Sequence, residues 1–129
     1  MNKLLLYSLY AIIVCSIVGC GKKRIDIDFQ QHEARFADIP IPFQITPLRG
    51  STSPQSCAFI LTENQSDCVH FYKLEMERMG WKLISEFQGF EAVLIFEKLQ
   101  RICNISIRPT RQDKDESVQV VIIQMNKLN

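Results

Sequence analysis

Thiols, imidazoles and carboxylates are the side chains of this chain that could perform chemistry, and five cysteines stand out among its 129 residues. Cys15 and Cys20 lie in and directly after an apolar N-terminal run, which leaves Cys57, Cys68 and Cys103 for a folded domain. An odd number of thiols outside the cytoplasm allows one disulfide with one thiol left over, or no disulfide at all.

Histidine and cysteine do not combine into a metal site in this sequence. His32 stands alone in a polar segment, while Cys68 and His70 are two residues apart and would point to different faces of a helix. A tetrahedral zinc site needs four ligands, usually two pairs at matching spacing. We therefore expect no metal ion and no other cofactor.

A catalytic role would rest on carboxylates in a charged loop near the end of the chain, at Asp113, Asp115 and Glu116. Such a loop is usually only solvated. The sequence contains no paired nucleophile and base in a motif, and no glycine-rich phosphate loop. We therefore expect a protein that is not an enzyme.

Residues 1–19 have the layout of an export signal. Lys3 gives a short positive start, and residues 4–18 form an uncharged run of 15 residues. A membrane-spanning helix needs about 20 apolar residues. The run is too short for that and is typical of the apolar part of a signal peptide.

Ile17-Val18-Gly19-Cys20 ends the apolar run and resembles the lipobox of bacterial lipoproteins. By that resemblance, the sulfur of Cys20 receives a diacylglycerol, the chain is cut before Cys20, and the new amino group is acylated, for example with palmitate. Each buried CH₂ of such chains contributes about 0.8 kcal/mol to membrane binding. The alternatives are an uncleaved anchor helix and ordinary secretory cleavage.

Cleavage before Cys20 would remove Lys3 and leave 110 residues with 14 basic and 14 acidic side chains. This balance gives no basic surface for nucleic acid. The residue after the cysteine is Gly21, where an aspartate resembles an inner-membrane retention signal in enteric bacteria. We therefore expect a place in the cell envelope, on the outer membrane facing the periplasm rather than on the inner membrane.

The remaining chain divides into a tether and a single domain. Residues 20–37 are polar and lack a sustained apolar face, so we expect a lipidated cysteine followed by a flexible tether. Residues 38–129 form the domain, which opens with an extended lead-in. Pro40 and Pro42 fix φ and remove backbone donors, so this lead-in should stay outside a central β-ladder.

One amphipathic helix is predicted over residues 67–79. Ser66 or Asp67 would cap its start. Gly80 would end it in left-handed geometry, with Trp81 folding back onto the last turn where helix and sheet meet. The apolar stripe of this helix is formed by Val69, Tyr72, Met76 and Met79.

Runs of apolar or alternating residues predict one strand before this helix and four after it. Short connections favour antiparallel neighbours. The sequence therefore predicts an α+β domain in which one helix packs on a mainly antiparallel sheet, in the order strand, helix and four strands. The predicted strands cover residues 57–62, 81–87, 92–96, 102–108 and 118–124.

This layout also bears on the thiols. Cys57 begins a strand and Cys68 begins the helix after that strand has ended, so their Cα atoms should exceed the limit of about 7 Å for a disulfide. Cys68 and Cys103 belong to faces that should meet inside the domain. We expect both to be small, buried and unreactive.

From residue 38 onward the chain resembles a family of small, uncharacterised bacterial lipoproteins. The family carries a D-x-P-x-P lead-in, a helix with F-Y…M…G-W, and a later L-x-F-x-K…C-x-I-x-I, and it implies the fold rather than an activity. The loop at residues 51–56 departs from its glycine-richer lead-in. The matching residues are Asp38, Pro40, Pro42, Phe71, Tyr72, Met79, Gly80, Trp81, Leu94, Phe96, Lys98, Cys103, Ile105 and Ile107.

Two functions remain open for such a domain. The first is a non-catalytic envelope lipoprotein, anchored through lipid on Cys20, that binds a protein partner through its sheet or loops as a binding or assembly module. The second is a small-molecule or lipid binder with a groove between helix and sheet, lined by Tyr72, Met76 and Phe96.

Overall fold

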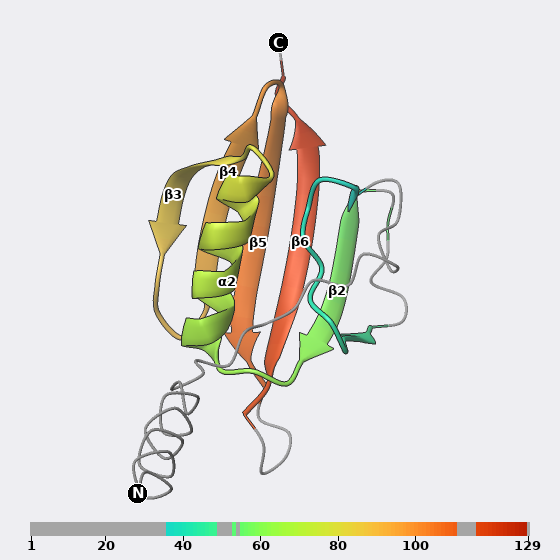
Figure 1. Cartoon of the computed structure of the whole chain (residues 1–129), viewed down its shortest axis with the longest axis vertical. Helices are drawn as coiled ribbons and strands as arrows, with labels where there is room; N and C mark the ends of the chain where they lie inside the picture. Colours follow the sequence, from blue (N-terminus) through green and yellow to red (C-terminus); the bar gives the residue numbers. More distant parts are fainter. Residues whose placement is uncertain (1–35, 49–52, 54, 111–115, 129) are drawn as a thin grey trace, which may run out of the picture.

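The computed structural model describes residues 36–48, 53, 55–110 and 116–128. In these residues one helix, α2 (Gln65–Arg78), lies on one face of a six-stranded sheet (Figure 1). Every pair of neighbouring strands is antiparallel. The predicted α+β class is therefore confirmed. The predicted order of one strand, the helix and four more strands holds for the long strands, and a two-residue strand, β1 (Thr46–Pro47), precedes them.

The last four strands form the predicted meander, and the order across the sheet is β1-β2-β6-β5-β4-β3. The first long strand, β2, pairs with the last one, β6, rather than with a neighbour in sequence. Helix α2 makes its contacts with β3, β4 and β5. The strands are β1 (Thr46–Pro47), β2 (Ser56–Leu61), β3 (Lys82–Phe87), β4 (Ala92–Lys98), β5 (Arg101–Pro109) and β6 (Val118–Asn126).

The start of α2 differs from the prediction. Asn64 is the N-cap, and its side-chain oxygen accepts a hydrogen bond from the backbone N–H of Asp67 at 2.7 Å. The Asn64 amide in turn donates to the Asp67 carboxylate at 2.9 Å. The predicted caps, Ser66 and Asp67, are wrong because Asn64 already satisfies the first turn, and the helix begins two residues earlier than expected.

The end of α2 matches the prediction. Gly80 has φ +88°, and its N–H donates to the carbonyl of Glu77 at 3.0 Å. The N–H of Trp81 donates to the carbonyl of Met76, also at 3.0 Å. These two bonds form a Schellman motif, which satisfies the last carbonyls of the helix and turns Trp81 back into the core at 2 % exposure.

The lead-in at residues 36–48 covers the part of the sheet that α2 leaves open. Phe36, Ile39 and Ile41 are all buried in the core, and the segment crosses the same face of the sheet as α2, over β6 and β2 (Figure 1). Its end forms β1, which pairs with β2 for two residues at the edge of the sheet. Phe36, which precedes the predicted boundary at residue 38 by two residues, is part of this core.

The tether, the signal segment and Cys20 lie outside the described residues, except for residues 36 and 37 at the end of the tether. Among the residues that are described, no helix is long and apolar enough to cross a membrane.

In the core between α2 and the sheet, one buried side-chain polar atom lacks a hydrogen-bond partner within the part of the chain that the structure describes. Tyr72 is completely buried, and its hydroxyl finds no hydrogen-bond partner among the described residues. Burial raises the pKa of this hydroxyl well above its usual value, so it stays neutral. An unpaired buried hydroxyl costs about 1–3 kcal/mol relative to a satisfied one.

We therefore expect Tyr72→Phe to stabilise the domain by about 1 kcal/mol, because it removes the unpaired hydroxyl and keeps the ring. Urea unfolding of both proteins should show a higher midpoint for the variant. Tyr72→Leu is the control: it removes the ring as well and should lower the midpoint by creating a cavity. A Tyr72→Phe variant that is clearly less stable would mean that the hydroxyl is hydrogen-bonded in solution.

Candidate functional site

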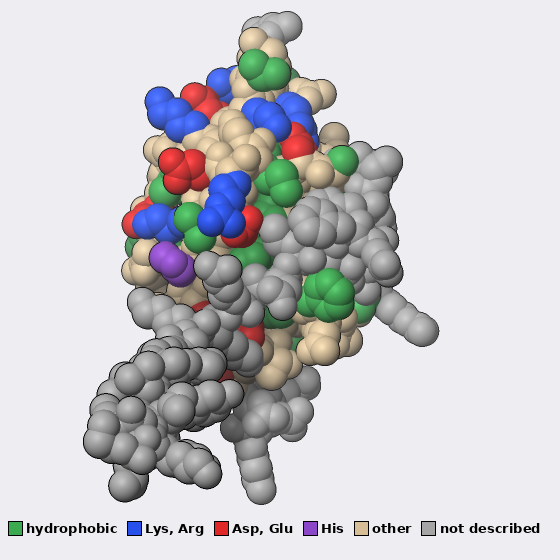
Figure 2. All heavy atoms as spheres, in the orientation of Figure 1, with side chains coloured by type: hydrophobic (Ala, Val, Ile, Leu, Met, Phe, Trp, Pro, Cys, Tyr) green, Lys and Arg blue, Asp and Glu red, His purple; other side chains and the backbone are tan. Residues whose placement is uncertain are grey.

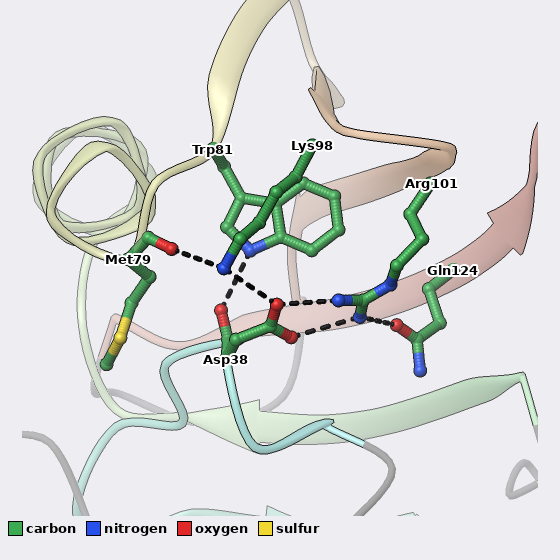
Figure 3. Close-up of polar contacts among 6 residues, drawn as sticks. All are labelled: Asp38, Met79, Trp81, Lys98, Arg101 and Gln124. Atoms are coloured by element: carbon green, nitrogen blue, oxygen red, sulfur yellow. Dashed lines mark hydrogen bonds and ion pairs between the residues drawn. The ribbon is translucent and has the colours of Figure 1, made fainter.

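The densest group of polar contacts surrounds Asp38 at the end of the sheet where α2 finishes (Figure 3). Arg101 makes a two-pronged ion pair with the Asp38 carboxylate, with N–O distances of 2.6 and 3.0 Å. Lys98 donates to the same carboxylate at 3.0 Å. The carboxylate therefore joins the lead-in to the end of β4 and the start of β5.

Trp81 lies beneath these charged groups. Its indole N–H donates to the backbone carbonyl of Asp38 at 2.8 Å. The Arg101 guanidinium lies 4.8 Å from the centre of the indole ring, and the Lys98 ammonium lies 5.9 Å from it. Both distances are within the range of cation–π attraction. The side chain predicted to join helix and sheet thus also fixes the lead-in.

Two further contacts complete this group. Lys98 donates to the carbonyl of Met79, the C-cap residue of α2, at 2.7 Å. Its side chain passes 3.4 Å from the position that a Cβ on Gly80 would take, so glycine suits this place for its conformation and for its small size. Arg101 also donates to the side-chain oxygen of Gln124 on β6 (Figure 3).

The charge on Asp38 is stabilised in the folded protein. Burial alone would raise the pKa of this carboxyl, but the hydrogen bonds and charges of Arg101 and Lys98 outweigh it and hold the pKa below the ordinary 3.8. Because each charged group already has an opposite charge in contact, the Asp38 cluster lacks an unengaged base or nucleophile. Its chemistry is that of a structural clamp.

Two hollows open beside these elements. One, of about 430 Å³, borders the clamp and is lined by polar side chains that include Arg101, Gln124 and Gln55. The other, of about 550 Å³, runs between α2 and β3. Trp81, Leu83 and Phe96 form the apolar part of this second hollow, which we call the α2–β3 groove. Charged and polar side chains at its rim are His70, Lys73, Glu77 and Lys82.

The groove predicted from the sequence is therefore only partly right. Phe96 lines the α2–β3 groove, but Tyr72 and Met76 are completely buried. The helical stripe is apolar as predicted, yet it faces the sheet so closely that no opening remains along it. The α2–β3 groove lies beside a different face of α2 from this stripe, the face on which Leu74 is 41 % exposed.

The other predicted groups are placed as follows. Cys68 is buried and His70 is exposed, so they do point to different faces. The described residues contain no group of three or more ligands that could hold a metal ion. Glu116 is exposed, while Asp113, Asp115 and His32 lie outside the described residues.

All three domain cysteines are present as thiols rather than as a disulfide. Cys68 and Cys103 are buried as expected, and Cys57 is half-buried. Burial raises the pKa of the Cys68 and Cys103 thiols to about 12, with smaller effects from neighbouring charges. A thiol with such a pKa is almost entirely protonated near neutral pH and is a poor nucleophile.

Sequence patterns do not predict the clamp. Asp38 and Lys98 appear in them only as motif positions, and Arg101 and Gln124 do not stand out at all. The partners are 60 and 63 residues apart in sequence, so no local period connects them. Two features of the sequence could have indicated the clamp. Asp38 opens the proline-containing lead-in, and Lys98 and Arg101 flank the tight turn between two strands.

We expect Asp38→Asn to lower the free energy of unfolding at pH 7 by about 2 kcal/mol, the range for hydrogen bonds to charged groups. Because the folded pKa of Asp38 is depressed, its stabilisation is present above pH 4 and is lost as the pH falls below 3.8. The gap between the urea midpoints of the wild type and the variant should therefore narrow as the pH falls through the lowered pKa of Asp38.

The control is Glu97→Gln, which breaks an ion pair with Lys127 on the surface and should change the midpoint little. A gap between wild type and Asp38→Asn that stays equal as the pH falls through the lowered pKa of Asp38 would contradict the electrostatic explanation.

Comparisons with known proteins found no match to this chain. No protein-family model matches the sequence, and no curated protein or solved structure matches it. The likeness to small bacterial lipoproteins stays a prediction, and the function has to be inferred from the described residues.

Proposed function

We propose that this protein is an envelope lipoprotein, held on the membrane by lipid on Cys20, whose domain binds another envelope protein without catalysing a reaction. The anchor is supported by the short apolar run and by Ile17-Val18-Gly19-Cys20 at its end. Gly21 supports the outer membrane, facing the periplasm, over the inner membrane. The binding role is supported by one surface of the domain.

That surface lies along β3 and the elements beside it. Four large apolar side chains are exposed on α2, on β3 and on the turn that follows β3. Their exposed fractions are 41 % for Leu74, 46 % for Ile84, 64 % for Phe87 and 63 % for Phe90. Together these four residues form what we call the β3 surface. These residues surround the β3 edge of the sheet, with Leu74 on the helix side and Phe87, which pairs with Val93, on the other side. Exposed apolar groups of this size are typical of protein interfaces, and aromatic residues dominate binding energy there.

The backbone of the turn at Phe90 and the ring of Phe87 are held in a defined geometry. Gln65 donates from its side-chain amide to the carbonyl of Phe90 at 2.8 Å and to the carbonyl of Ile107 at 3.1 Å, which ties the turn to β5. The ring of Phe87 folds over Gly89, where an added Cβ would lie 3.1 Å from it. Such preorganised aromatic side chains lose little entropy on binding.

The binding mode follows from the edge of the sheet. Among the described strands, β3 is the last of the sheet and pairs with β4 alone, so an extended partner would meet one open backbone edge. However, the register shifts between Leu83 and Ser85, and Lys82 begins the strand. Bulges and edge lysines hinder the addition of a further strand. We therefore propose contact through the apolar side chains of the β3 surface.

The α2–β3 groove supports a second candidate function, the binding of a small molecule or lipid. Its volume of about 550 Å³ is in the usual range for ligand sites, and its base is apolar. Its rim mixes positive and negative charges, as does the face over α2 seen in Figure 2. An acyl chain in the groove would contact Trp81, the sole tryptophan of the chain, and would change its fluorescence.

We expect Cys20→Ala to abolish membrane anchoring, since the thiol is the acceptor for the lipid. Cells fed a clickable fatty acid should label the wild type in the membrane fraction and leave the variant unlabelled. A substitution of Cys15, the other cysteine of the N-terminal segment, is the control and should keep both label and location. A labelled, membrane-bound Cys20→Ala protein would refute the anchor.

We expect the double substitution Phe87→Ser and Phe90→Ser to abolish capture of the partner from detergent-solubilised envelope, because it removes both aromatic anchors. Stability should change by less than about 1 kcal/mol, since both side chains are largely exposed. Phe43→Ser, at a phenylalanine of the lead-in that is 52 % exposed, is the matched control and should keep the partner.

Quantitative mass spectrometry of the captured proteins provides the measurement. Loss of the partner with Phe43→Ser to the same extent would place binding elsewhere. Absence of any reproducible protein, together with copurified lipid and an altered Trp81 fluorescence, would favour the second candidate.

A further inference from the structure

The sheet has a second face that no described helix or strand covers. Along the middle of β4, β5 and β6, side chains alternate between buried positions that point toward α2 and the lead-in, and half-buried or exposed positions that point away. On β2, Ala58 points away as well but is buried at 7 % exposure. Figure 1 shows α2 and the lead-in on the same side of the sheet. We call the opposite side the open face.

The strand registers arrange the open face in rows. One row runs through Ile95, Asn104 and Ile123, and the next through Val93, Ser106 and Val121. Charged groups on these strands stand only toward the two ends of the face. The apolar side chains of the face are Ala58, Ile60, Val93, Ile95, Ile102, Val121, Ile123 and Met125, and Phe87 lies at its β3 corner.

The charges at the ends are already engaged. At one end Arg108 donates to Gln119 at 3.0 Å, and at the other Glu97 pairs with Lys127 at 2.8 Å. A charge-free centre with a polar border is the composition of a protein interface. The central rows alternate the polar side chains of Asn104 and Ser106 with branched apolar ones, a surface against which the face of another sheet can pack.

We propose that the open face binds the open face of a second copy of this chain, sheet against sheet around a two-fold axis. Stacked sheets pack about 10 Å apart with strands crossing at about 30°. The five long strands, with β3 included at the edge, have a spacing of about 4.8 Å and a length of about 20 Å, which gives an area on the order of 500 Å² per copy.

Two copies would therefore bury on the order of 1,000 Å² in total, which is at the lower limit for a specific interface. The size predicts a reversible dimer rather than a permanent one. This face meets the β3 surface only at Phe87, and the dimer does not depend on the proposed partner.

The first experiment uses the full chain in its membrane. Asn104 lies at the middle of the open face, on the central strand, so the two copies of Asn104→Cys should meet across the two-fold axis. A bismaleimide cross-linker with a spacer of about 10 Å, the distance between stacked sheets, should give a species of twice the chain mass when it is added to membranes. Glu77→Cys, at an exposed position on α2, is the control and should stay monomeric.

The second experiment measures association of the purified full chain in detergent by sedimentation. Ile123→Lys places a charge near the centre of the face and should weaken dimerisation at least about tenfold, because that charge would be buried without a partner. Leu74→Lys is the control, because Leu74 lies on the helix side and is 41 % exposed, close to the 38 % of Ile123. This variant should dimerise like the wild type. Circular dichroism confirms that both variants fold.

Several outcomes would overturn the proposal. A wild type that stays monomeric and an Asn104→Cys chain that does not cross-link would exclude the dimer. A dimer that survives Ile123→Lys would place the interface elsewhere. A cross-linked product with a different protein would assign the open face to that protein. If the thiol introduced by Asn104→Cys is protected from a water-soluble maleimide without any cross-link, the open face would be assigned to the membrane surface.

Discussion

The ion pair between Asp38 and Arg101 is the contact on which the arrangement of the whole domain depends. A single helix about 10 Å wide covers only two or three strands, and α2 reaches β3, β4 and β5. The apolar side of β2 and β6 is covered by the lead-in instead. That segment has few backbone partners in the sheet, so the Asp38 cluster has to hold it there.

The position of Trp81 explains why the clamp can lie at the boundary of the core. The ring is buried, yet its N–H meets the Asp38 carbonyl and its face meets Arg101. Apolar burial, a hydrogen bond and a cation–π contact thus act on one side chain. Because the guanidinium binds two carboxylate oxygens and lies over the ring at once, a lysine at this position could not replace it.

Patterns along the chain are sufficient to predict the helix, the five long strands and the fold class, because each depends on local periodicity and turn residues. Gly80 and Trp81 follow from the same local rules. The pairing of β2 with β6, the short strand β1 and the clamp are not predicted, because each joins residues that are distant in sequence. The helix cap is not predicted for a different reason. Asn64 closely follows the apolar run of the preceding strand, so the sequence suggests that it ends that strand rather than caps the helix.

The place of β6 between β2 and β5 has a consequence for the time course of folding. A chain that emerges from its N-terminus presents the lead-in, β2 and α2 first, but β2 has no neighbour except the two-residue β1 until β6 arrives. The sheet cannot close before nearly all of the domain has emerged. Until β6 arrives, only α2 and the β3–β4–β5 meander can assemble, and β2 with the lead-in has to join them last.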